Sequence, residues 1–94
     1  MKLYLDDIRQ SPTGWLWCKS VEDAIASVTL FGVPEEMDLD HDLGKRTGMD
    51  FIKWLSEHSQ IVPKWRVHSM NPVGKANMEA FLTSWENFTK ENKC

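Results

Sequence analysis

The sequence contains little cysteine and no long apolar run. Its 94 residues include two cysteines, Cys18 and Cys94, far apart along the chain. Such a pair provides neither a disulfide framework nor a CxxC metal or redox motif, so we expect a reduced protein located in the cytoplasm. No stretch approaches the roughly 20 apolar residues of a membrane span, and the opening MKLYLDDIRQ has no signal-peptide core, so we expect neither membrane insertion nor secretion.

Basic residues do not outnumber acidic ones. The chain has 11 Lys and Arg against 14 Asp and Glu, for a net charge of −3. A protein held to DNA by its phosphates has a basic stripe or a high isoelectric point, so we expect no sequence-specific DNA binding. The length predicts a single domain over residues 1–94, with fraying at 90–94.

Apolar segments typical of strands alternate with amphipathic segments typical of helices. Strands are predicted at residues 2–6, 15–19, 36–40 and 65–69. Helices are predicted to begin at Ser20, near residue 51 and at Asn71. This order indicates an α/β fold in three layers, with a mostly parallel four-stranded sheet and about three helices on its faces. The orientation of the second strand stays open.

Two helix starts have a structural explanation. Thr47 and Asp50 precede an apolar stripe with the spacing of a capping box, and we favour that role over a functional one. Asn71 suits the cap of the last helix, with Pro72 in its first turn. Apolar residues at helical spacing predict the buried face of this helix: Val73, Ala76, Ala80, Phe81, Trp85 and Phe88.

Polar clusters follow three of the predicted strands. In chain order they are Asp6 with Asp7, Asp40 with His41 and Asp42, and His68 with Ser69 and Asn71. Ligands of open α/β sheets bind outside the carboxyl ends of the strands. If these strands are parallel neighbours, the three clusters converge in one pocket.

Four of the clustered residues are carboxylates: Asp6, Asp7, Asp40 and Asp42. Close carboxylates repel unless they share a proton or a cation, so we expect a divalent metal here. Oxygen ligands favour Mg²⁺ or Mn²⁺, and His41 or His68 would also admit Zn²⁺. For Asp7 or Asp42 alone, a turn or helix cap is an equal alternative.

The segment 68–75 runs from a strand end into a helix start, where the helix dipole favours an anion. Lys75 adds a positive charge in the first turn. Capping accounts for Asn71, whereas His68 and Ser69 have no such structural role and are the better functional candidates.

Five tryptophans are many for this length: Trp15, Trp17, Trp54, Trp65 and Trp85. Most are expected in the core or on a sheet face, because aromatic side chains bury large areas. A platform for base stacking is the less favoured alternative, because the sequence shows no basic groove.

Three motifs in this order resemble the cyclic-phosphate processing receiver domain. They are LDD at 5–7, LDHDLG at 39–44 followed by TGMD at 47–50, and VHSMNPVG at 67–74. The resemblance covers about residues 2–80. It implies a compact variant of the receiver or flavodoxin-like fold, with an acidic pocket and a role in processing cyclic phosphates on nucleotides or RNA ends.

The resemblance also assigns residues. In a receiver, acids after the first strand and at the end of the third bind Mg²⁺, and the latter accepts phosphate; Asp6, Asp7 and Asp40 match these places. Ser69 matches the hydroxyl after the fourth strand. The chain departs from a full receiver in two ways. Its first connection is too short for a helix, and no room remains for a fifth strand. In receivers that strand carries a functional lysine, and here Lys75 would have to take the place of that lysine.

Two hypotheses of function remain, and the sequence does not decide whether the protein is an enzyme. The first is a metal-dependent phosphoesterase acting on a small phosphate compound or an RNA end. Its expected residues are Asp6, Asp7, Asp40 and Asp42 as metal ligands, Asp40, His41 and His68 as catalytic groups, and Ser69, Asn71 and Lys75 as phosphate contacts. The second is an inactive receiver-like module that grips a protein partner or sequesters a nucleotide, favoured by an exposed patch of Trp15, Trp17 or Trp54.

Overall fold

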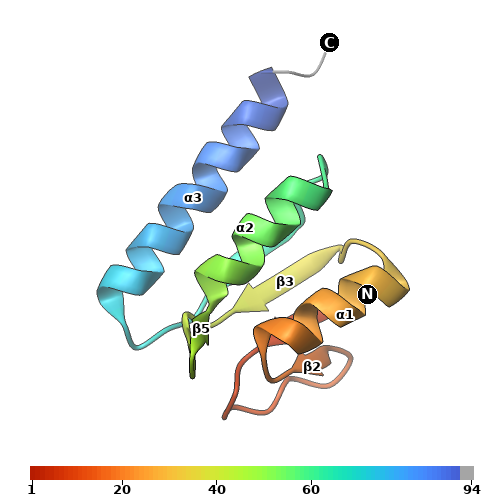
Figure 1. Ribbon diagram of the computed structural model, residues 1–94, viewed down its shortest axis with the longest axis vertical. Helices are drawn as coiled ribbons and strands as arrows, with labels where there is room; N and C mark the ends of the chain where they lie inside the picture. Colours follow the sequence, from red (N-terminus) through yellow and green to blue (C-terminus); the bar gives the residue numbers. More distant parts are fainter. Residues whose placement is uncertain (92–94) are drawn as a thin grey trace.

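The computed structural model describes residues 1–91, and Cys94 lies outside them. The elements, in chain order, are β1 (Lys2–Leu5), β2 (Leu16–Cys18), α1 (Val21–Phe31), β3 (Glu36–Leu39), β4 (Asp42–Leu43), β5 (Arg46–Thr47), α2 (Gly48–His58), β6 (Lys64–Val67) and α3 (Pro72–Glu91) (Figure 1).

The main sheet has four strands in the order β2, β1, β3, β6, and all neighbours are parallel. The α/β class and the four-stranded sheet with three helices are thus confirmed, and the second strand is parallel to the first. The chain passes from β1 outward to β2 and then returns to β3 on the other side of β1. The strand order therefore reverses between β1 and β3, the place where open α/β sheets bind ligands.

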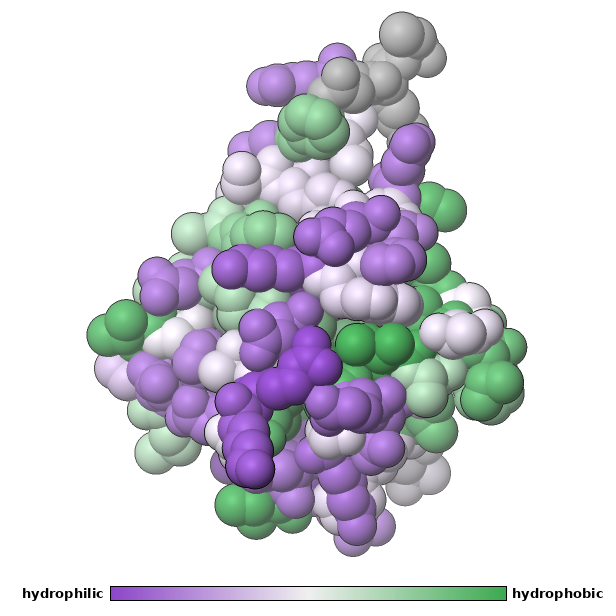
Figure 2. Space-filling model, viewed as in Figure 1, coloured by the Kyte–Doolittle hydropathy of each residue, from purple (hydrophilic) through white to green (hydrophobic). Residues whose placement is uncertain are grey.

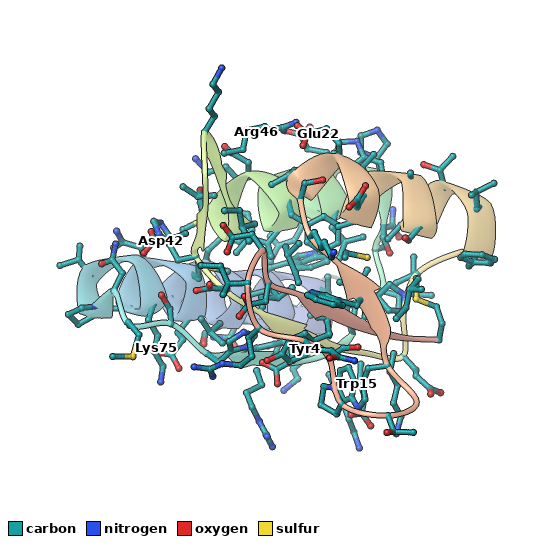
Figure 3. The ribbon with its side chains drawn as sticks, turned by 90° about the horizontal axis from the view of Figure 1, so that it is seen from below. Tyr4, Trp15, Glu22, Asp42, Arg46 and Lys75 are labelled. Atoms are coloured by element: carbon teal, nitrogen blue, oxygen red, sulfur yellow. The ribbon has the colours of Figure 1, made fainter. Side chains whose placement is uncertain are left out.

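All three helices pack on the same face of the sheet. The side chains on this face are apolar and buried, as shown by Leu3 and Leu5 of β1 and by Met37 and Leu39 of β3. Helix α2 lies between α1 and α3 and contacts both. Helices α1 and α2 stand in front of the sheet in Figure 1 and above it in Figure 3, whereas α3 lies beside α2 and the edge strand β6. The hydrophobic core therefore lies between this helical layer and the sheet.

The other face of the sheet carries polar side chains, and no helix formed by residues 1–91 covers it. We call it the open face, formed by Lys2, Tyr4, Glu36, Asp38, Lys64 and Arg66. The connection after β1 covers part of it: Trp15 packs edge-on against Tyr4, with ring centroids 6.5 Å apart (Figure 3). Three layers were expected. The helices and the sheet form two of them, and the connection after β1 occupies part of the third.

The segment after β3 is more ordered than the sequence predicts. No strand is predicted between residue 40 and the helix near residue 51, but β4 and β5 make a small antiparallel hairpin whose turn contains Gly44 at φ 80°. The next helix begins at Gly48, earlier than expected. The backbone N–H of Thr47 donates to the Asp50 carboxylate at 3.0 Å, so the structural role predicted for this pair is confirmed.

The prediction for the buried face of α3 was wrong at several positions. The buried residues of this helix are Gly74, Met78, Leu82 and Trp85. Val73 is 69% exposed and Phe88 64% exposed, while Ala76 and Ala80 are also exposed. Hydrophobicity alone predicted that Val73 is buried. In the structure it is Gly74, which has no side chain, that packs against the rest of the molecule. Residues 90 and 91 belong to α3, and the rest of the tail expected to fray, 92–94, lies outside the described residues.

The surface carries scattered apolar side chains rather than a tryptophan patch. Trp85 is buried, and the other four tryptophans are partly buried. On the helical side of the molecule, hydrophilic residues are interspersed with separate apolar areas (Figure 2). Within residues 1–91, no helix has the length and hydropathy needed to cross a bilayer.

Candidate functional site

Three polar side chains meet at the carboxyl ends of β1, β3 and β6. Asp6, Asp40 and His68 each directly follow one of these strands, and backbone hydrogen bonds continue the sheet beyond the strand ends: Asp40 N–H donates to the carbonyl of Leu5, and His68 N–H to that of Leu39, both at 2.9 Å. Each of the three residues offers one ligand atom, and these atoms lie within 4.8 Å of one another. The parallel order of the strands thus produces the convergence that the sequence predicts.

Asp6 is buried and held in place by the backbone that follows it. Its Oδ1 accepts hydrogen bonds from the N–H groups of Ile8 at 2.9 Å and Arg9 at 2.7 Å, and its Oδ2 lies 2.9 Å from Nε2 of His68. Burial disfavours the charged carboxylate, but the two N–H donors and His68 outweigh it, so the pKa of Asp6 lies below its usual value. Asp6 is therefore an oriented carboxylate.

His68 lies between two carboxylates. Its Nε2 faces Asp6, and its Nδ1 is 2.5 Å from Oδ1 of Asp38. Its ring stacks on Tyr4 with centroids 4.8 Å apart. Burial disfavours the imidazolium, but the hydrogen bonds with Asp38 and Asp6 outweigh it and raise the pKa of His68. A doubly protonated ring donates to both carboxylates at once.

Asp38 and Tyr4 were not predicted as part of this site. Asp38 lies within the central strand β3, and its carboxylate fixes the His68 ring from the open face. Tyr4 supports the same ring from β1. The signal available in the sequence was the carboxylate itself, because aspartate is disfavoured inside a strand that is paired on both sides.

A second cluster, of His41, Asp42 and Asn71, lies beside the first. Nδ1 of His41 is 2.8 Å from Oδ1 of Asp42, and the Asn71 side-chain amide donates to the same oxygen at 3.4 Å. The hydrogen bond from His41 lowers the pKa of Asp42, whose side chain is 61% exposed. No other partner of the His41 ring is found in residues 1–91, so its Nε2 is available to a ligand.

The N-terminal end of α3 packs against this second cluster. Oδ1 of Asn71 accepts the N–H of Gly74 at 3.0 Å, which confirms the capping role predicted for Asn71, and Ser69 Oγ accepts the N–H of Asn71 at 3.1 Å. A Cβ on Gly74 would lie 2.4 Å from the His41 ring. The missing side chain therefore allows His41 to pack directly on the helix.

The structure divides the four carboxylates expected as metal ligands. Asp6 and Asp40 join His68 in one group, Asp42 belongs to the His41 cluster, and Asp7 is exposed. In the part of the chain that is described, no other group of three or more metal-ligating side chains occurs.

The chemistry of this group fits a divalent cation. Asp6 keeps Oδ2 free of backbone donors, Asp40 adds a second carboxylate, and a deprotonated Nε2 of His68 would complete the set. Two hard oxygens with one imidazole nitrogen suit Mn²⁺ or Zn²⁺ better than Mg²⁺.

Stability of the metal-free protein is expected to fall on both sides of a mildly acidic pH range. The raised pKa of His68 means that its stabilising contribution is complete below pH 6.5 and lost as the pH rises through that pKa. The lowered pKa of Asp6 means that its contribution is present above pH 3.8 and lost as the pH falls through that pKa. Urea unfolding of the chelator-treated protein at a series of pH values measures both losses of stability.

Asp38→Asn should reduce the loss of unfolding free energy at alkaline pH, because it removes one carboxylate partner of His68. Glu57→Gln, an exposed change on α2, should leave the profile as in wild type. A wild-type free energy of unfolding that rises from about pH 6.5 to pH 9 would contradict the arrangement.

Comparison with known proteins gives one result. The family model of the cyclic-phosphate processing receiver domain matches residues 1–84. No curated protein and no solved structure matches the chain. The match includes β1, β3, β6 and the residues of both clusters, together with most of α3. The chain therefore belongs to the cyclic-phosphate processing receiver domain family.

Proposed function

We propose that this protein is a metal-dependent enzyme that processes a cyclic phosphate ester. The observation that carries the proposal is the group formed by Asp6, Asp40 and His68 at the strand ends of a chain that belongs to this family. A divalent cation held by these three residues would polarise phosphoryl oxygens and lower the pKa of a bound water.

His41 is the proposed general acid or base. Its Nδ1 is bonded to Asp42, which orients the ring, and Nε2 is left to exchange a proton with the ester. His68 is less suited to this role, because both of its ring nitrogens are engaged with Asp6 and Asp38. The geometry thus supports a ligand role for His68 and a proton-transfer role for His41.

Ser69, Asn71 and Lys75 are the proposed phosphate contacts. The N–H groups of Gly74 and Lys75 already donate to Asn71, so they are not free to bind a phosphate. The first turn of α3 would instead attract the phosphate through the helix dipole and the Lys75 ammonium. In residues 1–91 the Lys75 ammonium has no carboxylate partner, which leaves its charge for an anion.

The test is turnover of 2′,3′-cyclic mononucleotides by purified protein, first stripped with a chelator and then supplied with Mn²⁺, Zn²⁺ or Mg²⁺. We expect hydrolysis with Mn²⁺ or Zn²⁺ and none in the chelator. His41→Gln should lower kcat by roughly 10²-fold, as loss of a general acid or base does. His58→Gln, at the far end of α2, is the matched control. Absence of turnover with every metal would overturn the proposal.

The alternative of an inactive binding module lacks the observation that would favour it. An exposed patch of tryptophans would favour that hypothesis, but Trp15, Trp17 and Trp54 are all partly buried.

A further inference from the structure

The outer side of α3, opposite its buried residues, is not covered by another helix of residues 1–91. Helix α2 lies between α1 and α3, so α3 is at the edge of the helical layer (Figure 1). Val73, Ala76, Ala80 and Phe88, four of the apolar residues that the sequence predicts to be buried, are exposed on α3. One chain by itself therefore does not bury this part of the apolar pattern of the helix.

A shallow groove runs along the outer side of α3. All of its lining residues lie between positions 79 and 91 of this helix, and they include Ala80, Thr83 and Ser84. These three side chains are small and exposed. The axes of packed helices lie about 8 to 10 Å apart, and small side chains at the contact allow the closer approach. The groove is therefore suited to a second helix.

The residues along the groove are arranged symmetrically about Ser84. Ala80 lies four residues before Ser84, and Phe88 lies four residues after it. When a second α3 lies antiparallel with its Ser84 against the first, each Phe88 is level with Ala80 of the other copy. Phe88 is 64% exposed, so its ring can cover the small residue opposite it. A two-fold symmetric interface joins one surface to itself and requires this kind of self-complementarity.

Two charged residues on one flank of the groove follow the same symmetry. Glu79 lies five residues before Ser84 and Lys90 six residues after it, so the two are about three helical turns apart and point to the same flank of α3. Within residues 1–91 neither side chain makes an ion pair. An antiparallel second α3 brings each Glu79 level with Lys90 of the other copy. The charges are therefore complementary to a second copy of this chain.

We propose that this protein forms a two-fold symmetric dimer through the outer side of α3, with the two helices antiparallel and Ser84 at the symmetry axis. The contact is small and partly polar, so we expect a dissociation constant on the order of micromolar. The dimer interface does not include Asp6, Asp40 or His68. The proposal is therefore independent of the proposed function, and either can fail without the other.

Sedimentation velocity of the full chain at concentrations from about 1 to 500 μM measures the association. We expect the mass to rise with concentration from that of one chain toward that of two. Phe88→Ala should weaken the association at least about ten-fold. Phe31→Ala is the matched control, because it makes the same change at a 66% exposed position of α1, and it should leave the association unchanged. A chain that stays monomeric throughout, or equal losses in the two variants, overturns the proposal.

A charge exchange tests the antiparallel arrangement. Glu79→Lys and Lys90→Glu should each weaken the association about five-fold, because each variant places like charges opposite each other at both ends of the interface. The variant with both substitutions should regain most of the wild-type affinity. Lys53→Glu, at an exposed position of α2, should have no effect. No recovery in the double variant overturns the proposed pairing.

A disulfide at the symmetry axis tests the register in a Cys94→Ser background, in which the remaining native thiol, Cys18, is buried. Ser84→Cys should give a disulfide-linked dimer under mild oxidation, because the two copies of this residue face each other across the axis. Asn77→Cys is the matched control at an exposed position two turns earlier. Its two copies would lie about 21 Å apart along the helices and should not cross-link. Equal cross-linking at both positions overturns the arrangement.

Discussion

Asp40→Asn is expected to lower kcat/KM for a cyclic phosphate by roughly 10²- to 10³-fold, because it removes one of two carboxylates facing the proposed cation and with it about 3 to 4 kcal/mol of charge stabilisation. Calorimetric titration with Mn²⁺ gives a readout independent of turnover, and affinity should fall in the same variant. The fold should be kept, since Asn can still accept the hydrogen bond that Asp40 Oδ1 receives from the His41 N–H.

Asp7→Asn is the matched control. It makes the same chemical change one residue after Asp6, at an exposed position outside the group of three. Its kcat/KM and Mn²⁺ affinity should stay within about two-fold of wild type. Equal losses in Asp7→Asn and Asp40→Asn would mean that the cation site is not the one that the geometry indicates.

Gly48→Ala is expected to lower the free energy of unfolding by about 3 kcal/mol, and the melting temperature by more than about 10 °C. A Cβ at this position would lie 2.2 Å from the carbonyl oxygen of Asp40 and 2.7 Å from the end of the Met78 side chain. The Met78 methyl group can move, but the carbonyl belongs to the backbone leaving β3, and the N–H of Gly48 is bonded to His41. The clash therefore displaces the segment that carries both clusters.

The sign of this effect is informative, because Gly to Ala inside a helix ordinarily stabilises by about 0.5 to 1 kcal/mol. Lys53→Ala, at an exposed position of the same helix, serves as the control in chemical unfolding. Gly74→Ala should cost less stability, since the atoms it meets belong to the His41 side chain, but it should impair turnover. An unchanged or raised melting temperature in Gly48→Ala would contradict the close approach.

The strand ends could be predicted from the sequence because apolar segments stop where polar residues begin. Asp6, Asp40 and His68 each follow such a segment, and parallel pairing brings them together. Asp38 could not be predicted in the same way. Its role depends on which face of β3 lacks a helix, and that is decided by the packing of all three helices on the other side.

The rotation of α3 about its axis was predicted incorrectly. The predicted stripe placed Val73 and Phe88 inward, whereas the buried residues are Gly74, Met78, Leu82 and Trp85, and Gly74 has no side chain that a count of apolar residues could include. The close approach to His41 is a tertiary contact between segments far apart in the chain. Periodicity describes one helix by itself and carries no information about such a contact.

The candidate ligands come singly from three strands, with one each from β1, β3 and β6. An unfolded chain does not hold these residues together, so occupancy of the site and folding of the domain are thermodynamically linked. A ligand present at a hundred times its dissociation constant would add about 2.7 kcal/mol to the free energy of unfolding. The ligand concentration in the cell would thus affect the lifetime of the folded protein, independently of any reaction at the site.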